Sequence, residues 1–318
     1  MLDRNGRAID YLRISLTDRC NLRCTYCMPE DGIDKKYHED ILRFEEIATI
    51  IRTAARLGIT KIRLTGGEPL VLKDIEEVVR YAKNTPGIRE IGMTTNGILL
   101  AEKAEALKAA GLDRVNISLD TLDADKFREI TRGGDINKVL HAVDKVLSLD
   151  MKPVKINTVL MRGFNDDEVG DLMDLTRERP IQVRFIELMP LGQGEAAFEE
   201  RFMEGDEILQ SYPELQPTRD KSRVARVFRL PGAVGSVGFI SPLSCKFCQD
   251  CNRIRLTSSG TIKPCLHSAE EVNLRPFLHD DEALYDLLKR TIYEKPKEHH
   301  LETDKKSQTF RMMFQIGG

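Results

Sequence analysis

Two separated groups of three cysteines are the residues in this chain most able to do chemistry. One group lies near the start of the 318-residue chain and the other near its end: Cys20, Cys24 and Cys27, then Cys248, Cys251 and Cys265. Iron–sulfur clusters are usually held by four thiolates, so three thiolates around a four-iron cube leave one iron free to bind a small molecule. Each group therefore predicts a cluster with an open iron, and an open iron indicates catalysis.

The first group follows a predicted strand directly, with the spacing C-x3-C-x2-C. A loop with this spacing can wrap around one cube, and it lies where barrel enzymes place their catalytic groups, at the C-terminal end of a strand. The alternative is a structural zinc site. Zinc prefers four ligands, and no further Cys or His is locally spaced to supply the fourth. The pattern favours a cluster.

The second group is ambiguous because another cysteine, Cys245, stands close to it. Cys245, Cys248 and Cys251 recur every third residue, and with Cys265 they would make a ferredoxin-like set of four that closes the cluster to other ligands. A four-thiolate zinc site is the other closed interpretation. The residues alone leave both the open and the closed interpretations in place.

The elements that must carry these groups alternate between strand and helix. Strands are predicted near 11–17, 61–65, 91–95, 114–119, 155–160 and 182–188, with helices such as 44–57, 75–83, 101–110 and 166–179 between them. Parallel neighbours need a long return connection, which these helices supply. Eight such units make a complete barrel, so six predict an incomplete (β/α)6 TIM-like barrel of α/β class.

After Gly192 this alternation stops. A helical piece at 206–211, an antiparallel segment at 223–240, the second cysteine group and a helix at 282–293 predict a smaller α+β C-terminal region that closes the barrel. We expect residues 1–218 to form the partial barrel and residues 219–318 the C-terminal region.

The predicted strands carry polar residues on one face, although parallel strands covered by helices are normally apolar on both faces. Five of these polar residues are cations: Arg13, Lys61, Arg63, Lys155 and Arg184. An antiparallel sheet with one wet side is the alternative, but the intervening helices argue against it. Buried cations are strongly disfavoured unless they are paired, so the pattern predicts a cavity that takes a phosphate-bearing ligand.

Composition narrows the class of protein. The formal net charge of −3 excludes a globally basic nucleic-acid binder. Seven cysteines in a long chain indicate thiolates that serve metals in a reducing compartment, not a secreted disulfide framework. The first residues contain no apolar run typical of a signal peptide, and no stretch is long enough to span a bilayer. We expect a cytoplasmic protein without a membrane or nucleic-acid partner.

The segment TDRCNLRCTYCMP resembles the radical S-adenosylmethionine (SAM) superfamily, in which three cysteines hold a cluster that binds SAM on its open iron. Tyr26 takes the aromatic position before the third cysteine. GGEP, which ends the second predicted strand, resembles the superfamily segment that receives the amino group of SAM, and glycine there lets the backbone approach closely. The resemblance also places Ser118 and Met189 around SAM. Taken alone, the first is an ordinary hydroxyl and the second an ordinary core methionine.

The second group resembles a narrower family. FCQDCNRIRL and the later CL are similar to the motif of the GTP 3′,8-cyclases of molybdenum cofactor biosynthesis, the MoaA family. The resemblance covers essentially the whole chain, through TGGEPL, TTNG, NISLDTLD and RFIELMP, and ends at Ile316-Gly317-Gly318. It selects the open set of three, from which Cys245 is a departure. It also implies that the diglycine tail reaches into the active site, whereas two terminal glycines usually mean a frayed end.

Residue roles follow from the resemblance only where the motifs match. It implies a 4Fe–4S cluster on each cysteine group, with Tyr26, Gly67, Ser118 and Met189 around SAM. It implies that substrate GTP binds to Arg13, Arg63, Thr94, Lys155, Arg253 and Arg255, of which the last two are catalytic together with the first three cysteines. Arg253 and Arg255 would share one side of a strand.

The implied reaction begins with an electron from a donor such as flavodoxin or ferredoxin. Cleavage of SAM gives a 5′-deoxyadenosyl radical, which removes the 3′ hydrogen of GTP and leads to 3′,8-cyclo-7,8-dihydro-GTP, an early intermediate of molybdopterin synthesis. The implied downstream partner is cyclic pyranopterin monophosphate synthase, and we expect a homodimer. Two alternatives are a peptide-modifying radical SAM enzyme, for which the cations are a poor match, and a non-catalytic zinc or redox sensor.

Overall fold

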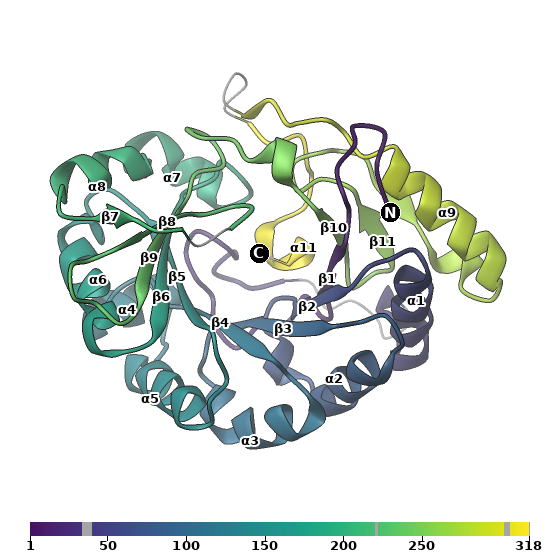
Figure 1. Ribbon diagram of the computed structural model, residues 1–318, viewed down its shortest axis with the longest axis horizontal. Helices are drawn as coiled ribbons and strands as arrows, with labels where there is room; N and C mark the ends of the chain where they lie inside the picture. Colours follow the sequence, from purple (N-terminus) through teal and green to yellow (C-terminus); the bar gives the residue numbers. More distant parts are fainter. Residues whose placement is uncertain (34–39, 220–221, 302–305, 318) are drawn as a thin grey trace.

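A computed structural model describes residues 1–33, 40–219, 222–301 and 306–317. Its first half alternates strands and helices, and the helices lie on the outside of a curved sheet (Figure 1). The strands are β1 (Tyr11–Ser15), β2 (Lys61–Thr65), β3 (Glu90–Thr95), β4 (Arg114–Ser118), β5 (Val154–Leu160) and β6 (Ile181–Glu187). The helices are α1 (Phe44–Arg56), α2 (Ile75–Asn84), α3 (Leu100–Ala110), α4 (Ala124–Thr131), α5 (Ile136–Ser148) and α6 (Val169–Glu178).

The rest of the chain is a mixed region of shorter elements. Its helices are α7 (Gly194–Arg201), α8 (Gly205–Ser211), α9 (Asp281–Tyr293) and α11 (Met313–Ile316). Its strands are β7 (Gln216–Pro217), β8 (Arg226–Arg229), β9 (Ser236–Ile240), β10 (Arg253–Leu256), β11 (Thr261–Lys263) and β12 (Val272–Asn273). All of these strands join the same sheet as the first six.

The single 12-stranded sheet has the order β12-β11-β10-β1-β2-β3-β4-β5-β6-β9-β8-β7. Strands β10, β1 to β6 and β9 pair in parallel, and the short outer strands pair antiparallel. Among the described residues no ladder joins the two ends of this order, so the barrel is partial and is not closed by hydrogen bonds.

The predicted partial barrel is confirmed, and the parallel register removes the antiparallel alternative. The C-terminal region does more than cover the barrel, because it extends both edges of the sheet. The predicted antiparallel segment is present as the β8–β9 pair, but β9 also pairs in parallel with β6. The periodicity of the first six units could not reveal that β9 and β10 extend the parallel part of the sheet. The boundary after residue 218 stays a prediction.

Alternation along the strands separates a core from a lumen. In β1, Leu12 and Ile14 are fully buried against the outer helices, whereas Arg13 lines a cavity inside the barrel. Helix α1 supplies the matching apolar face through Ile47, Ile50 and its neighbours, which recur at helical spacing. The apolar core therefore lies between sheet and helices, and the inner face is left for chemistry. In the described part of the chain, no helix is both long and apolar enough to cross a bilayer.

Candidate active site

The first cysteine loop leaves the C-terminal end of β1 and turns tightly on itself. Backbone N–H groups of Cys27 and Met28 both donate to the Cys24 carbonyl, at 2.9 and 3.0 Å. All three thiols are half-buried. Burial raises the pKa of Cys24 well above its usual value, with the charges of Cys27 and Asp120 adding to the effect. Burial likewise raises the pKa of Cys27 to about 12. A positive iron centre is the partner that would favour the thiolates.

The GGEP turn packs against this loop through its backbone. Gly67 N–H donates to the Thr17 carbonyl at 2.7 Å, and Glu68 N–H donates to the Arg19 carbonyl at 2.8 Å. A Cβ added at Gly67 would lie 2.4 Å from the Arg19 carbonyl oxygen, so this position excludes any side chain. Glycine is thus required for the close approach of this turn to the cysteine loop, whereas the predicted approach to SAM stays a prediction.

A buried carboxylate, Glu68, links the GGEP turn to the TTNG segment. It accepts hydrogen bonds from the Thr95 hydroxyl at 2.8 Å and from Asn96 N–H at 2.7 Å. Burial raises the pKa of Glu68 to about 7. The Asn96 amide in turn lies 3.7 Å from the Cys20 sulfur. The sequence did not single out Asn96, and only its place after a strand could have indicated it.

Tyr26 points to a second buried carboxylate. Its hydroxyl donates to Asp120 at 2.7 Å, and Val159 N–H donates to the other carboxylate oxygen at 2.9 Å. Burial raises the pKa of Asp120 to about 6. Ser118, which ends β4, lies in register with Asn157, and Met189 lies on the wall of the cavity. Asp120 belongs to the NISLDTLD motif, but it was given no role in the sequence analysis.

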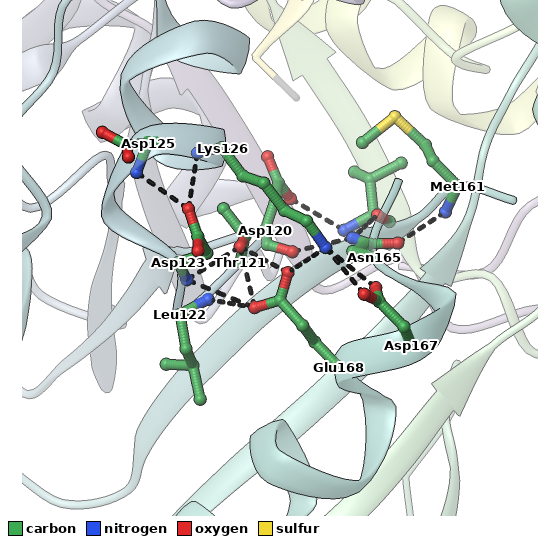
Figure 2. A network of polar contacts seen from close by, with 11 residues as sticks. Asp120, Thr121, Leu122, Asp123, Asp125, Lys126, Met161, Asn165, Asp167 and Glu168 are labelled. Atoms are coloured by element: carbon green, nitrogen blue, oxygen red, sulfur yellow. Dashed lines mark hydrogen bonds and ion pairs between the residues drawn. The ribbon is translucent and has the colours of Figure 1, made fainter. Parts of the chain in front are cut away.

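Figure 2 shows how the segment after Asp120 is fixed. The Asn165 amide donates to the Asp120 carbonyl at 2.7 Å, and Glu168 accepts from the Thr121 hydroxyl at 2.6 Å and from Leu122 N–H at 2.7 Å. These bonds tie the end of β4 to the segment between β5 and α6. They hold the carboxylate opposite Tyr26 on a rigid support, as a preorganised site requires.

The second cysteine group lies at the opposite end of the strands from the first, because Cys251 precedes β10, Cys265 follows β11, and β10 runs parallel to β1. Cys248, Cys251 and Cys265 are half-buried, whereas Cys245 is exposed. Burial raises the pKa of Cys248. Burial also acts to raise the pKa of Cys251, but Lys295 and Arg253 outweigh it, and that pKa lies below its usual value. Cys251 therefore differs from the thiols of the first group, because nearby cations favour its thiolate.

The N-terminal turn holds the second cysteine loop in place through Arg7. Its guanidinium donates to the carbonyls of Cys248 and Lys297, both at 2.8 Å, and to the Pro296 carbonyl at 2.7 Å. Asp3 pairs with Arg7 at 2.6 Å, and both side chains are almost fully buried. Residues from both ends of the chain thus fix one loop. The sequence analysis did not identify this pair.

A cavity of about 660 Å³ lies inside the barrel, next to the second cysteine group. The five predicted cations lie on its wall together with the three cysteines of that group: Arg13, Lys61, Arg63, Lys155 and Arg184. Arg253 and Arg255 lie on the same wall. We call this cavity the cationic chamber. Its volume falls in the range of small-molecule sites. The predicted cation-lined cavity is confirmed.

The chamber concentrates positive charge, and its buried cations repel one another. Burial, together with the neighbouring Arg184 and Arg114, lowers the pKa of Lys155 to about 6. Burial and Arg63 lower the pKa of Arg184 to about 9. Burial and Arg253 lower the pKa of Arg255 to about 10. Such mutual repulsion is relieved when a polyanion enters, so the chamber suits a phosphorylated ligand.

The C-terminal tail enters the middle of the barrel, where Figure 1 shows α11 and the end of the chain. The Gly317 carbonyl accepts from Arg13 at 2.9 Å and from Arg255 at 2.6 Å. A Cβ at Gly317 would lie 2.3 Å from the Thr65 methyl group. The tail therefore reaches the site as predicted, and glycine is required there. Gly318 lies outside the described residues.

The tail also separates the first cysteine group from the chamber. The backbone of Phe314 donates a hydrogen bond to Cys27, two residues before Ile316, whose carbonyl accepts from Arg255 at 3.1 Å. The wall of the chamber includes neither Cys20, Cys24 nor Cys27. The structure thus places the second cysteine group on the chamber and the first behind the tail.

Both groups offer the chemistry that iron–sulfur clusters need, because each has three half-buried thiols whose charges act on one another. Within the described residues, no three His, Cys, Asp or Glu side chains are arranged to hold a single metal ion. Some buried side-chain polar atoms make no hydrogen bond in the described structure: the Thr94 hydroxyl, the Asn157 side-chain oxygen Oδ1 and Arg253 Nε. Native proteins rarely leave such atoms unsatisfied, so the residues fit a site completed by a ligand.

Comparison with known proteins gives the family. Residues 14–176 match the radical SAM superfamily, and residues 181–301 match a family described as Molybdenum Cofactor Synthesis C. A GTP 3′,8-cyclase from Clostridium botulinum is 53% identical over 319 residues, covering 100% of both chains. One from Alkaliphilus oremlandii is 49% identical over 320 residues, again covering 100% of both chains.

The chain belongs to the GTP 3′,8-cyclase family. It is therefore a radical SAM enzyme, and the superfamily implies one 4Fe–4S cluster and SAM. The fold agrees with a solved structure of Streptococcus suis SuiB bound to S-adenosylmethionine. That likeness has a TM-score of 0.58 and 16% identity, and it covers 97% of this chain and 77% of SuiB. At this identity it shows the fold alone.

Proposed function

We propose that this cyclase-family enzyme converts GTP to 3′,8-cyclo-7,8-dihydro-GTP, an early step of molybdenum cofactor biosynthesis, with two 4Fe–4S clusters and SAM. One observation carries the proposal: a chamber crowded with cations lies directly against the second cysteine group. A nucleoside triphosphate would bring negative charge to these crowded cations and a base that can reach an open iron.

The first cysteine group would hold the cluster that binds SAM. Tyr26, Gly67, Ser118 and Met189 would lie around that cofactor. When bound, the cluster and SAM together supply a 5′-deoxyadenosyl radical that removes the 3′ hydrogen of GTP. Two buried carboxylates, Glu68 and Asp120, lie beside the first cysteine group. In their charged forms they suit a sulfonium cofactor with an amino group.

The second cysteine group would hold a cluster whose open iron faces the guanine. Arg253 and Arg255 project from β10 toward the same chamber, in register with Tyr11 and Arg13 of β1. This arrangement would place a base near the cysteines and a triphosphate among the cations. Cys245 is exposed and would stay outside the ligand set.

The substrate residues would bind, orient and exclude water. Arg13, Arg63, Lys155 and Thr94 would bind the triphosphate and ribose, since guanidinium groups match phosphate oxygens and the Thr94 hydroxyl lacks a partner in the described structure. Arg63 is already held by Asn116 at 3.1 Å and by the Met93 carbonyl at 3.0 Å. Such preorganisation reduces the cost of orienting the substrate.

The remaining expectations concern partners. A one-electron donor such as flavodoxin or ferredoxin would serve the first cluster, and cyclic pyranopterin monophosphate synthase would take the product. The homodimer, the cytoplasmic location and the domain boundary at residue 218 stay predictions from the sequence.

The test is formation of 5′-deoxyadenosine that depends on GTP. Anaerobic reconstitution should give about eight irons per chain, two cubes. With reductant and SAM, this protein should form 5′-deoxyadenosine together with cyclised GTP when GTP is present, and neither when GTP is replaced by a peptide. A protein that binds about four irons, or that forms 5′-deoxyadenosine without consuming GTP, would contradict the proposal.

A further inference from the structure

Tyr11 is a buried residue of the chamber that the resemblance to the cyclases does not assign. It is the first residue of β1, and only 8% of it is exposed. The parallel register places it beside Lys61 of β2 and Arg253 of β10. Residues paired in this way share a face of the sheet, so all three line the chamber.

The hydroxyl of Tyr11 fixes one substrate arginine. Arg63 Nε donates to this hydroxyl at 2.8 Å. The other end of the same guanidinium is held by Met93 and Asn116. A Cβ at Gly92 would lie 2.6 Å from the guanidinium carbon, so Arg63 has no room to move toward β3. The Tyr11 hydroxyl therefore fixes the Nε edge of this guanidinium, which Met93 and Asn116 do not contact.

The ring of Tyr11 fixes a second substrate arginine. The Arg253 guanidinium lies 5.7 Å from the Tyr11 ring centroid and 6.0 Å from that of Phe247. Arg253 Nε makes no hydrogen bond in the described structure. The two aromatic faces are thus the contacts that hold this arginine, through an attraction between cation and ring.

We propose that Tyr11 is a positioning residue of the substrate chamber, whose hydroxyl orients Arg63 and whose ring orients Arg253. This inference rests on the proposed function, because it takes both arginines as contacts of the substrate. A single side chain would then align a guanidinium from β2 with one from β10. Tyr11 would thus link β2 and β10, the strands on either side of β1, in one recognition site for a nucleoside triphosphate.

Electrostatics give this arrangement a signature that a purely structural role lacks. Burial acts to raise the pKa of Tyr11, but Arg63, Arg13 and Arg253 outweigh it and lower that pKa to about 7. The other charged groups that act on its phenolate are Arg114, Arg184 and Arg255. Lys61 lies beside it in the neighbouring strand, within 3.9 Å of Asp10.

The sign of the effect follows from linkage. Above about pH 7 the phenol of the empty chamber is ionised, and a polyanion drives it back to the neutral form. Ligand binding then takes up a proton, so affinity falls as pH rises above about 7, by at most about tenfold per pH unit. Lys155 and the ligand phosphates titrate too, but they do so equally in a Tyr11 variant.

The experiment compares the holoenzyme with Tyr11→Phe, Tyr11→Leu and Phe247→Leu, and uses exposed Tyr293→Leu as the control. Binding of GTP and of inorganic tripolyphosphate is measured by calorimetry from pH 6 to pH 9. Tyr11→Phe should weaken both ligands about tenfold at pH 6, the worth of one hydrogen bond to a charged group. The Kd ratio of Tyr11→Phe to wild type should shrink as pH rises, and the variant should take up fewer protons at pH 8.

The remaining variants separate the ring from the hydroxyl. Tyr11→Leu should lose about two- to fivefold more affinity than Tyr11→Phe, because Arg253 loses its ring contact. Phe247→Leu should weaken binding by a similar small factor and keep the wild-type pH dependence. It tests the Arg253 half of the proposal even where Tyr11→Leu does not fold.

Equal Kd values for wild type and Tyr11→Phe, or a ratio that does not change with pH, would overturn the inference. So would an equal loss in Tyr293→Leu. The tripolyphosphate measurement keeps the two proposals distinguishable. A wild-type protein that does not cyclise GTP contradicts the proposed function. The ratio of the tripolyphosphate Kd of Tyr11→Phe to that of wild type still decides the role of Tyr11.

Discussion

Each cysteine group has three thiols, but the two groups differ in their spacing and in their surroundings. Beside the first group lie the buried carboxylates of Glu68 and Asp120, and the pKa of Cys24 is raised by burial and by negative neighbours. Beside the second group lie cations, and Lys295 and Arg253 outweigh burial to lower the pKa of Cys251. On the proposed function, the first surroundings suit a positive ligand and the second suit a negative one.

On the proposed function, this difference would let one barrel sort two ligands that both carry a purine nucleoside. SAM brings a sulfonium and an amino group, whereas a nucleoside triphosphate brings several negative charges. Charge complementarity favours each ligand at one site and disfavours it at the other. The C-terminal tail lies at the boundary, with Phe314 bonded to Cys27 and Gly317 bonded to Arg13 and Arg255.

The most direct test of this difference is to remove the cluster from one cysteine group. Cys24→Ala should abolish SAM cleavage, because two thiolates do not secure the first cluster, and should reduce the iron content from about eight to about four per chain. GTP should still bind at the second site. Iron analysis, a 5′-deoxyadenosine assay and a GTP binding measurement check these outcomes; persistent SAM cleavage would mean that the initiating cluster is elsewhere.

The support of the second group can be tested through its buried ion pair. Arg7→Ala leaves the Asp3 carboxylate buried and three backbone carbonyls without their donor, which should cost about 3 to 5 kcal/mol of unfolding free energy. Denaturant unfolding measures this change. Iron should be lost from the second group only. The exposed Arg4→Ala is the matched control, and equal losses in both variants would remove Arg7 from this role.

The next prediction concerns the cations beside the second cysteine group. Arg255→Ala should leave both clusters intact and lower GTP turnover about a hundredfold, because it removes a buried donor to an anionic substrate. Arg253→Ala should act in the same direction. SAM binding should not change in either variant. Unchanged turnover in both would exclude these arginines from the site.

A smaller effect is expected at the first site. Asp120→Asn should weaken SAM binding about tenfold and leave GTP binding unchanged, since it removes one nearby negative charge. Burial raises the pKa of Asp120 to about 6, so wild-type affinity for SAM should fall as pH drops below about 6, where the carboxylate becomes neutral. The variant should lack this fall. Asp125→Asn on the exposed face of α4 is the control.

The sequence predicted the strand positions and the inward cations well, because a period of two on successive strands is a local signal. It could not reveal that β9 and β10 join the barrel, since pairing between distant segments leaves no local pattern. Arg7 was missed for the same reason: its partners lie near residue 248 and near residue 297. Tyr11 was given no role in the sequence analysis, and only its contacts with Arg63 and Arg253 suggest one.

Ligand-induced changes in the spectrum of each cluster test the central claim most directly. Two variants, Cys24→Ala and Cys251→Ala, should each retain one reduced cluster whose paramagnetic resonance spectrum can be followed separately. We predict that GTP changes the spectrum of the cluster on Cys248, Cys251 and Cys265 alone, and that SAM changes that of the cluster on Cys20, Cys24 and Cys27 alone. A response of both clusters to one ligand, or of the first cluster to GTP, would contradict the account.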